Sequence, residues 1–148
     1  MRLANDEPWT EGRVPEHYDI DSEAAIERRE AGLEVLAGID GEDARTVIDG
    51  LAEVSPALAH HIAAWGFGEI YARPGLDPRS RQLVTLGILT ALGTDPQLRV
   101  HINTSLNVGI TREEITEVFL HSALYAGFPR AINATLVARD VFAERDRG

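Results

Sequence analysis

The stretch that decides the fold runs from Trp65 to Ala134 and opens with WGFGEIYARPGLDPRSRQLVTLGILTALG (residues 65–93). It continues through RVHINTSLNVG (99–109) and closes with YAGFPRAINA (125–134). Apolar residues recur in it at helical spacing, and groups that can do acid–base chemistry interrupt them. Because cysteine is absent from the stretch, we expect a small helical enzyme without a redox centre.

Proline and glycine divide the whole chain into successive helices. Three helix starts place a capping residue directly before a proline; they are Ser55-Pro56, Asp77-Pro78 and Asp95-Pro96. Thr111 and Glu114 form a capping box, and a glycine ends four of the expected helices. No strand-like alternation of useful length occurs. We therefore predict an all-α fold with helices at about residues 22–38, 42–53, 56–71, 77–93, 95–109, 111–127 and 129–144.

Length and composition limit the size of the fold, the expected location of the protein and the chemistry open to it. With 148 residues, 44% of them hydrophobic, the chain can bury one sizeable core. We expect residues 1–21 to form an irregular arm and residues 22–148 a single domain. No apolar run reaches the roughly 18 residues of a membrane span, and the polar N-terminus has no signal-peptide core, so we expect a cytoplasmic protein. The absence of cysteine excludes disulfides, thiol redox chemistry and thiolate metal sites.

The charge balance indicates which partners to expect. A net charge of −10 argues against nucleic acid and anionic membranes as partners. All 14 basic residues are arginine, a bias that a GC-rich genome would explain without any function. In either case the chain cannot form a Schiff-base lysine, and a clamp for a carboxylate must be a guanidinium.

The expected helix over residues 77–93 is apolar nearly all round after its first turn. A helix of this kind is buried on all sides, either at a subunit interface or as a central core helix in a monomer. We expect an oligomer in which the apolar face is shared between chains. The apolar residues are Leu83, Val84, Leu86, Ile88, Leu89 and Leu92.

Glu69 is the first candidate for acid–base chemistry. It follows His61 and Trp65 at intervals of four residues, so the three side chains would share one stripe of a helix. An apolar stripe runs beside it, and a carboxylate at the edge of a buried face can have a raised pKa. The alternative is a solvated glutamate that pairs with Arg73, four residues on.

His101 is the second candidate, between Leu98 and Ile102 on the inward stripe of its helix. Its ordinary pKa suits proton transfer near neutral pH, although a lone histidine on an apolar face can equally be a core residue. We expect no metal site, because His60 and His61 are adjacent and so diverge on a helix. No glycine-rich phosphate loop and no nucleophile elbow is present.

At this point the chain resembles a known family. The segments GEIYARPGLDPRSRQLVTL (68–86), QLRVHINTSLNVGITREEI (97–115) and YAGFPRAINA (125–134) are similar to the carboxymuconolactone decarboxylase family, within the alkylhydroperoxidase D-like superfamily. The resemblance extends over about residues 22–144. It implies a bundle of about six to seven helices, assembly into trimers or hexamers, and a site at a subunit boundary that needs no cofactor.

Departures from the family pattern exclude one branch and alter the pocket. The peroxidase branch carries two cysteines and an upstream glutamate, which fall here at Thr94, Gln97 and Gln82. Thiol peroxidase activity is therefore excluded, and Gln82 cannot carry a proton as a glutamate would. The decarboxylases of the family also have a histidine where this chain has Trp65.

The resemblance implies decarboxylation of a small carboxylated lactone by acid–base catalysis, with no metal or organic cofactor. Loss of carbon dioxide sends electrons into the lactone, and a carbon of the resulting enolate needs a proton. We assign His101 as proton donor or enolate partner, and Glu69 as the second acid or base. The substrate-binding candidates are Arg81 or Arg73 as anion anchor, Gln82, Tyr125 and Asn103 as orienting groups, and Trp65 as a pocket wall.

Two other functions stay open. A biosynthetic tailoring enzyme could reuse the pocket for isomerisation, cyclisation or lactone opening, and the changes at Trp65 and Gln82 favour this alternative. A non-catalytic oligomer that binds a ligand or serves as a scaffold is the third reading. For the enzyme readings the expected partners are a small carboxylate or lactone and further copies of the chain.

Overall fold

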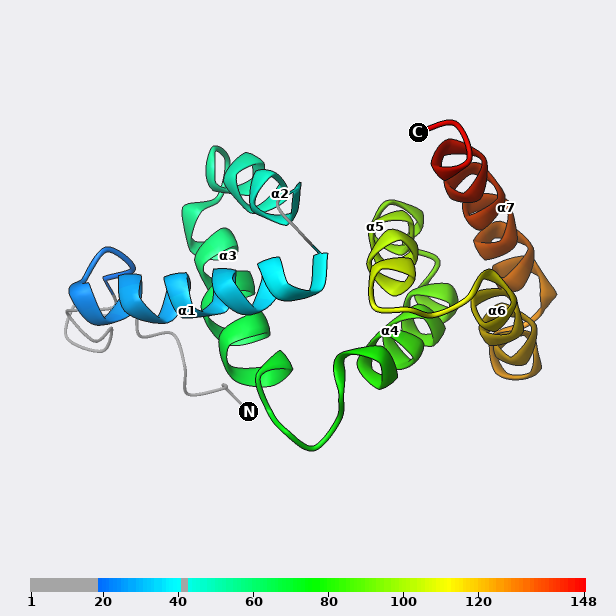
Figure 1. The fold of residues 1–148 in the computed structure, drawn as a ribbon, viewed down its shortest axis with the longest axis horizontal. Helices are drawn as coiled ribbons and strands as arrows, with labels where there is room; N and C mark the ends of the chain where they lie inside the picture. The colour runs from blue at the N-terminus through cyan, green and yellow to red at the C-terminus, as the bar shows by residue number, and fades with distance from the viewer. Residues whose placement is uncertain (1–18, 41–42) are drawn as a thin grey trace, which may run out of the picture.

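A computed structural model describes residues 19–40 and 43–148, and the predicted all-α fold is confirmed for this part of the chain, which contains no strand (Figure 1). Most of the predicted arm, residues 1–18, lies outside the described residues. No helix in the described ranges has the length and apolar character needed to cross a membrane. The helices are α1 (Glu23–Asp40), α2 (Asp43–Ala52), α3 (Pro56–His61), η1 (Ile62–Tyr71), α4 (Pro78–Leu92), α5 (Asp95–Asn107), α6 (Arg112–Ala126) and α7 (Phe128–Arg145).

The helices form two groups, joined by the linker of residues 72–77 (Figure 1). Helices α1, α2, α3 and η1 make the first group, and α4 to α7 make the second. Each group buries its own apolar cluster, which is the main source of its stability. The first cluster contains Leu33, Leu36, Ile48, Ala59 and Ala63. The second contains Leu86, Leu98, Ile102, Ile110, Ile115, Phe119, Ala134, Ala138 and Val141.

The helix starts follow the sequence signals with one correction. The Asp77 carboxylate accepts the backbone N–H of Ser80 at 3.0 Å, as an N-cap does. The predicted capping box of Thr111 and Glu114 is present. The prediction that Asp95 caps α5 is wrong, because Thr94 occupies the cap position. Asp95 instead lies in the first turn, where the helix dipole favours a negative charge.

The third predicted helix is not α-helical throughout. It is α-helical from Pro56 to His61 and continues as the π-helix η1 to Tyr71. In a π-helix the hydrogen bonds run from i to i+5, which widens each turn. Glu69 on η1 is exposed, as are His61 and Trp65, so it does not lie at the edge of a buried face in a single chain, and the alternative of a solvated glutamate fits this exposure.

Helices α1 and η1 touch through their backbones at Gly32. A Cβ atom at this position would lie 1.9 Å from the carbonyl oxygen of Ala63 on η1. Gly68 on η1 is also close to this crossing, since a Cβ there would lie 3.4 Å from the Cα of Gly32. Only glycine permits this crossing, which sets the distance between the two helices that form the core of the first group.

Helix α4 is apolar nearly all round, yet one of its faces is open to solvent. Val84, Ile88 and Leu92 are 54%, 53% and 60% exposed, whereas Leu86 is fully buried. The alternative of a core helix buried within a monomer is therefore wrong. Helices α6 and α7 carry further exposed apolar side chains, which are Leu120, Leu124, Phe128, Ile132 and Leu136.

We predict that Gly32→Ala destabilises the protein by about 1–3 kcal/mol, because the new methyl group forces the α1 and η1 backbones apart. The measurement is urea unfolding followed by circular dichroism. The matched control is Gly38→Ala in the same helix, where a Cβ meets nothing within 4 Å. The control should be neutral or stabilising by up to about 1 kcal/mol. Equal stability of the two variants would contradict the close crossing.

Candidate active site

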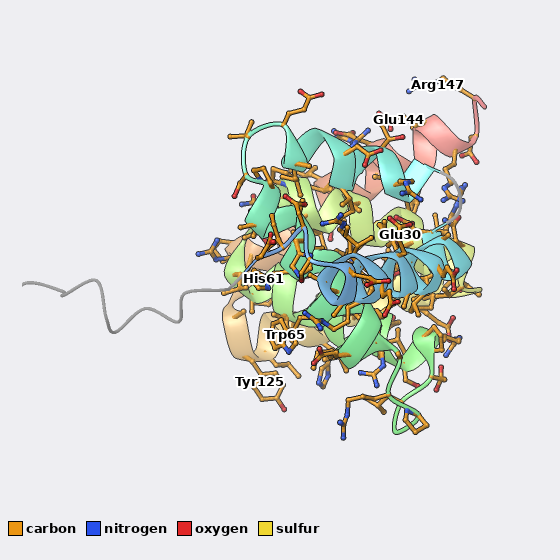
Figure 2. The ribbon with its side chains drawn as sticks, turned by 90° about the vertical axis from the view of Figure 1, so that its left-hand side faces the viewer. Glu30, His61, Trp65, Tyr125, Glu144 and Arg147 are labelled. Carbon is orange, nitrogen blue, oxygen red and sulfur yellow. The ribbon has the colours of Figure 1, made fainter. Side chains whose placement is uncertain are left out.

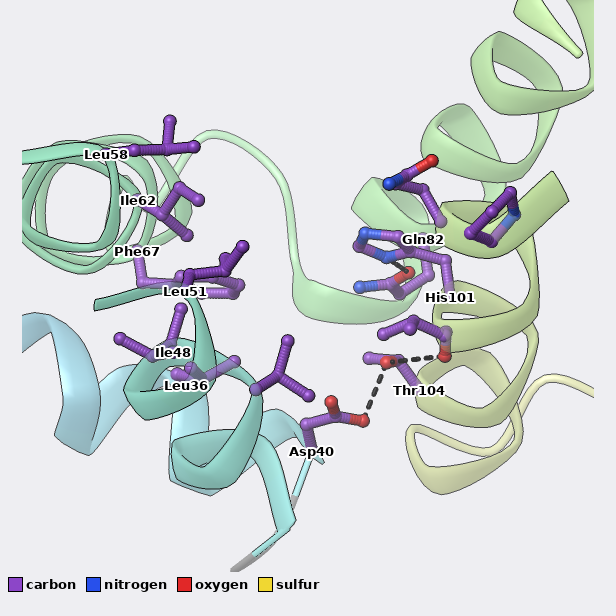
Figure 3. Close-up of a pocket in the computed structure, with 14 residues that line it drawn as sticks. Leu36, Asp40, Ile48, Leu51, Leu58, Ile62, Phe67, Gln82, His101 and Thr104 are labelled. Carbon is purple, nitrogen blue, oxygen red and sulfur yellow. Dashed lines mark hydrogen bonds between the residues drawn. The ribbon is translucent and has the colours of Figure 1, made fainter. Parts of the chain in front are cut away.

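A cavity of about 410 Å³ lies between the two helical groups (Figure 3). Its volume lies within the range of roughly 300–1,000 Å³ that is usual for small-molecule sites. The first group lines it with Leu36, Asp40, Val47, Ile48, Leu51, Leu58, Ile62 and Phe67. The second group lines it with Pro96, Val100 and the polar residues Gln82, Gln97, His101 and Thr104.

The two walls differ in chemistry. The wall of the first group is apolar except for Asp40, at the C-terminal end of α1. The wall of the second group carries an imidazole, two amides and a hydroxyl on α4 and α5. An apolar wall facing a few fixed polar groups strengthens electrostatic interactions with a bound molecule, because little water remains to screen them.

A chain of four hydrogen bonds begins at His101. Its Nδ1 lies 3.0 Å from the side-chain oxygen of Gln82, which is fully buried (Figure 3). The Gln82 amide nitrogen donates to the Tyr71 hydroxyl at 3.5 Å. The Tyr71 hydroxyl lies 3.3 Å from that of Thr85, and Thr85 donates to the backbone carbonyl of Arg81 at 2.9 Å. The chain links α5, α4 and η1, so it also joins the two helical groups.

The last bond of this chain fixes the direction of all the others. A carbonyl can only accept, so Thr85 uses its proton there and must accept from Tyr71. Tyr71 then accepts from the amide nitrogen of Gln82, which presents the Gln82 oxygen to His101. Nδ1 of His101 therefore carries a proton, and in the neutral ring Nε2 is the basic nitrogen.

Burial holds the pKa of His101 below the 6.5 of an ordinary histidine, and the negative charge of Asp40 opposes this shift only in part. The ring is thus mainly neutral at pH 7. A lowered pKa also makes the imidazolium a stronger acid whenever it forms.

Asp40 ties α1 to α5 at one end of the cavity. Its carboxylate accepts the Thr104 hydroxyl at 2.6 Å and the Asn107 amide at 3.5 Å. Thr104 lies one helical turn beyond His101, so the two side chains occupy the same face of α5 (Figure 3). Within residues 19–40 and 43–148 no group of three or more histidine, aspartate and glutamate side chains could hold a metal ion.

The structure brings His101 and Gln82 to the cavity, but not the other predicted site residues. Glu69 is exposed on η1, and the side chains of Trp65 and Tyr125 are 59% and 83% exposed at the periphery of the molecule (Figure 2). Trp65 therefore does not line this cavity in a single chain.

The remaining predicted residues have structural partners or lie in solvent. Arg81 donates to the backbone carbonyls of Leu76 and Arg73, at 3.1 and 2.9 Å, and so holds the linker in place. Asn103 accepts from Arg145 at 2.8 Å on the outer side of α5. The Arg73 side chain is exposed. Anion anchoring by either arginine remains a prediction.

Sequence analysis missed Asp40, Tyr71, Thr85 and Thr104. Thr104 follows His101 by three residues and Thr85 follows Gln82 by three residues. Residues at this spacing are neighbours on a helix, so both could have been found from the sequence. Nothing in the sequence pairs Asp40 with a residue 64 positions away. Tyr71 on η1 meets Gln82 on α4 only through tertiary packing, which the sequence does not reveal.

Comparison with known proteins identifies the family of this chain. The model of the carboxymuconolactone decarboxylase family matches residues 56–140, from α3 well into α7. The chain is 35% identical to a 4-carboxymuconolactone decarboxylase from Acinetobacter baylyi over 119 residues, which are 80% of this chain and 89% of the relative.

Two further relatives are similar over shorter stretches. A nitrosuccinic acid decarboxylase from Metarhizium robertsii is 38% identical over 78 residues, 53% of this chain and 54% of the relative. An uncharacterised 15.0 kDa protein from Paracoccus denitrificans is 32% identical over 98 residues, 65% of this chain and 73% of the relative. The family match spans more than half of the chain and includes the helices that carry His101 and Gln82. The chain therefore belongs to the carboxymuconolactone decarboxylase family.

Proposed function

We propose that this protein is a cofactor-independent decarboxylase that acts on a small carboxylated lactone or a related acid in the cavity between the two helical groups. Two relatives, the 35% and 38% identical proteins, are named as decarboxylases, which supports a decarboxylase-like activity. The observation that carries the proposal is His101, a neutral imidazole with a basic Nε2 on a ring that lines a largely apolar cavity.

The apolar wall favours the bond-breaking step. A carboxylate that enters the cavity loses water and is raised in free energy. As the bond to the carboxyl carbon breaks, carbon dioxide leaves without charge and the electron pair spreads over the unsaturated ring. In the transition state the negative charge is spread over the ring and is no longer concentrated on the carboxylate. The apolar wall therefore disfavours the transition state less than the bound carboxylate, which lowers the barrier.

His101 supplies the proton that balances the reaction. A carboxylate bound beside the ring favours the imidazolium, so substrate binding draws a proton from solvent onto Nε2. Gln82 accepts from Nδ1 in both protonation states and holds the ring in place. When carbon dioxide has left, Nε2 transfers the proton to the enolate carbon and returns to the neutral form that burial prefers.

A tailoring enzyme that isomerises its substrate is the second candidate. The neutral state of His101 favours it, because a basic Nε2 at pH 7 can remove a proton next to a carbonyl group. The two functions differ in their products, since isomerisation releases no carbon dioxide.

We predict that the purified protein releases carbon dioxide from 4-carboxymuconolactone or 2-nitrosuccinate, and that His101→Ala lowers kcat by about 10²–10⁴-fold because the proton donor is lost. Headspace detection of ¹³CO₂ from a labelled carboxyl group measures the reaction. His61→Ala, the same change outside the cavity, serves as the control and should keep the activity of the wild type. A folded wild type that releases none from either acid, or a fully active His101→Ala, would contradict the proposal.

We also propose that the chain assembles into a trimer or hexamer through the exposed apolar face of α4, α6 and α7. The exposure of Val84, Ile88 and Leu92 supports this proposal, because large apolar patches on a lone chain mark interaction sites. Assembly is also the route by which Glu69, Trp65 and Tyr125, outside the cavity of one chain, could border a site formed with a neighbour.

Mass photometry should find an assembly of three or six chains, and Ile88→Glu should convert it to monomers, because a charge would be buried at the interface. Val54→Glu is the matched control: Val54 is 90% exposed in the turn between α2 and α3, away from this face. A monomeric wild type, or an Ile88→Glu variant of unchanged mass, would overturn the proposed interface.

A further inference from the structure

The hydrogen bonds around Gln82 can run in two directions. In the first arrangement, described above, the Gln82 amide nitrogen donates to the Tyr71 hydroxyl and the Gln82 oxygen accepts from Nδ1 of His101. In the turned arrangement the amide oxygen and nitrogen exchange places, so Tyr71 donates to the oxygen and the nitrogen donates to Nδ1. The proton of the neutral ring then lies on Nε2, and the cavity loses its basic nitrogen.

Thr85 distinguishes the two arrangements. Its hydroxyl lies 3.3 Å from the Tyr71 hydroxyl and 2.9 Å from the backbone carbonyl oxygen of Arg81. In the first arrangement all the bonds of the chain form. In the turned arrangement Tyr71 uses its proton on Gln82, so Thr85 can give its own proton either to Tyr71 or to the carbonyl, but not to both. One hydrogen bond is lost, which favours the first arrangement by about five- to tenfold.

The other contacts of Tyr71 involve its ring and not its hydroxyl. The Phe67 ring lies 4.9 Å from the Tyr71 ring, and the Arg81 guanidinium lies 5.8 Å from the Tyr71 ring centre. These contacts hold the side chain in place in both arrangements. The direction in which the Tyr71 hydroxyl donates is therefore set by its polar neighbours, Gln82 and Thr85.

We infer that Thr85 is a positioning residue whose hydroxyl, acting through Tyr71 and Gln82, keeps the proton of the neutral His101 ring on Nδ1 and so leaves Nε2 basic. Thr85 is not among the residues that line the cavity, so it acts on a bound molecule only through this chain of bonds. The consequence for catalysis rests on the proposed function, whereas the position of the proton follows from the hydrogen bonds alone.

Thr85→Val tests the inference, because it removes the hydroxyl and keeps the shape of the side chain. The Tyr71 proton then has an acceptor only in the turned arrangement, on Gln82, so the preference reverses. Near pH 8, where the ring is neutral, ¹⁵N NMR should find the His101 proton mainly on Nε2 in this variant and mainly on Nδ1 in the wild type. The kcat/KM for decarboxylation should fall about five- to tenfold, as the fraction of the protein with a basic Nε2 falls.

Thr90→Val is the matched control. Thr90 lies on the same helix and also donates to a backbone carbonyl four residues earlier, that of Leu86 at 2.7 Å, but it is outside the chain of bonds. This control and Thr85→Ser, which restores the hydroxyl, should both keep the proton position and the activity of the wild type. Tyr71→Phe removes the hydroxyl that competes for Gln82, so both tautomers should be populated.

The outcomes separate this inference from the proposed function. A Thr85→Val ring that keeps its proton on Nδ1, or a Thr90→Val ring whose proton moves as far, overturns the inference. If Thr85→Val does not fold, a Tyr71→Phe ring with its proton wholly on Nδ1 overturns it instead. If the proton moves to Nε2 in Thr85→Val but the wild type releases no carbon dioxide from either acid, the inference stands and the decarboxylase proposal fails. If the wild type releases carbon dioxide and Thr85→Val is as active with its proton on Nδ1, the decarboxylase stands and the inference fails.

Discussion

The hydrogen-bond chain from His101 to the backbone carbonyl of Arg81 is the constraint on which the site depends. It passes from α5 to α4, crosses to Tyr71 on η1 and returns to α4, so one set of bonds joins the helical groups and orients the His101 ring. Its direction is set at the far end, by a carbonyl that can only accept. The tautomer of the neutral imidazole is thus set by a backbone carbonyl of α4, that of Arg81, which does not line the cavity.

The cavity needs both helical groups, because neither apolar cluster encloses it alone. The backbone contact of Gly32 with Ala63 fixes α1 against η1 and so places one part of the apolar wall, formed by Leu36, Ile62 and Phe67. The bond from Thr104 to Asp40 holds the end of α1 against α5 on the opposite side. Packing thus supplies an apolar wall, and hydrogen bonds orient the polar groups that face it.

The sequence was sufficient for the helices and for part of the site. Proline and glycine placed every helix to within a few residues, since they act through local backbone geometry. His101 and Gln82 were found because they interrupt apolar α-helical patterns. Glu69 and Trp65 lie exposed on η1, which residue type and spacing could not distinguish from a place in the pocket, and Asp40 meets Thr104 only through tertiary packing. The role of Arg81 in holding the linker depends on carbonyl positions that residue type does not reveal.

Nitrogen NMR of the His101 ring can locate its proton, because ¹⁵N shifts report which ring nitrogen is protonated. We expect a neutral ring at pH 7 with the proton on Nδ1 and a titration midpoint below 6.5. In Gln82→Glu the midpoint should rise, because a carboxylate that accepts from Nδ1 stabilises the imidazolium. A neutral ring with its proton on Nε2, or a wild-type titration midpoint above that of an ordinary histidine, would contradict the proposed hydrogen-bond chain and the effect of burial on the His101 pKa.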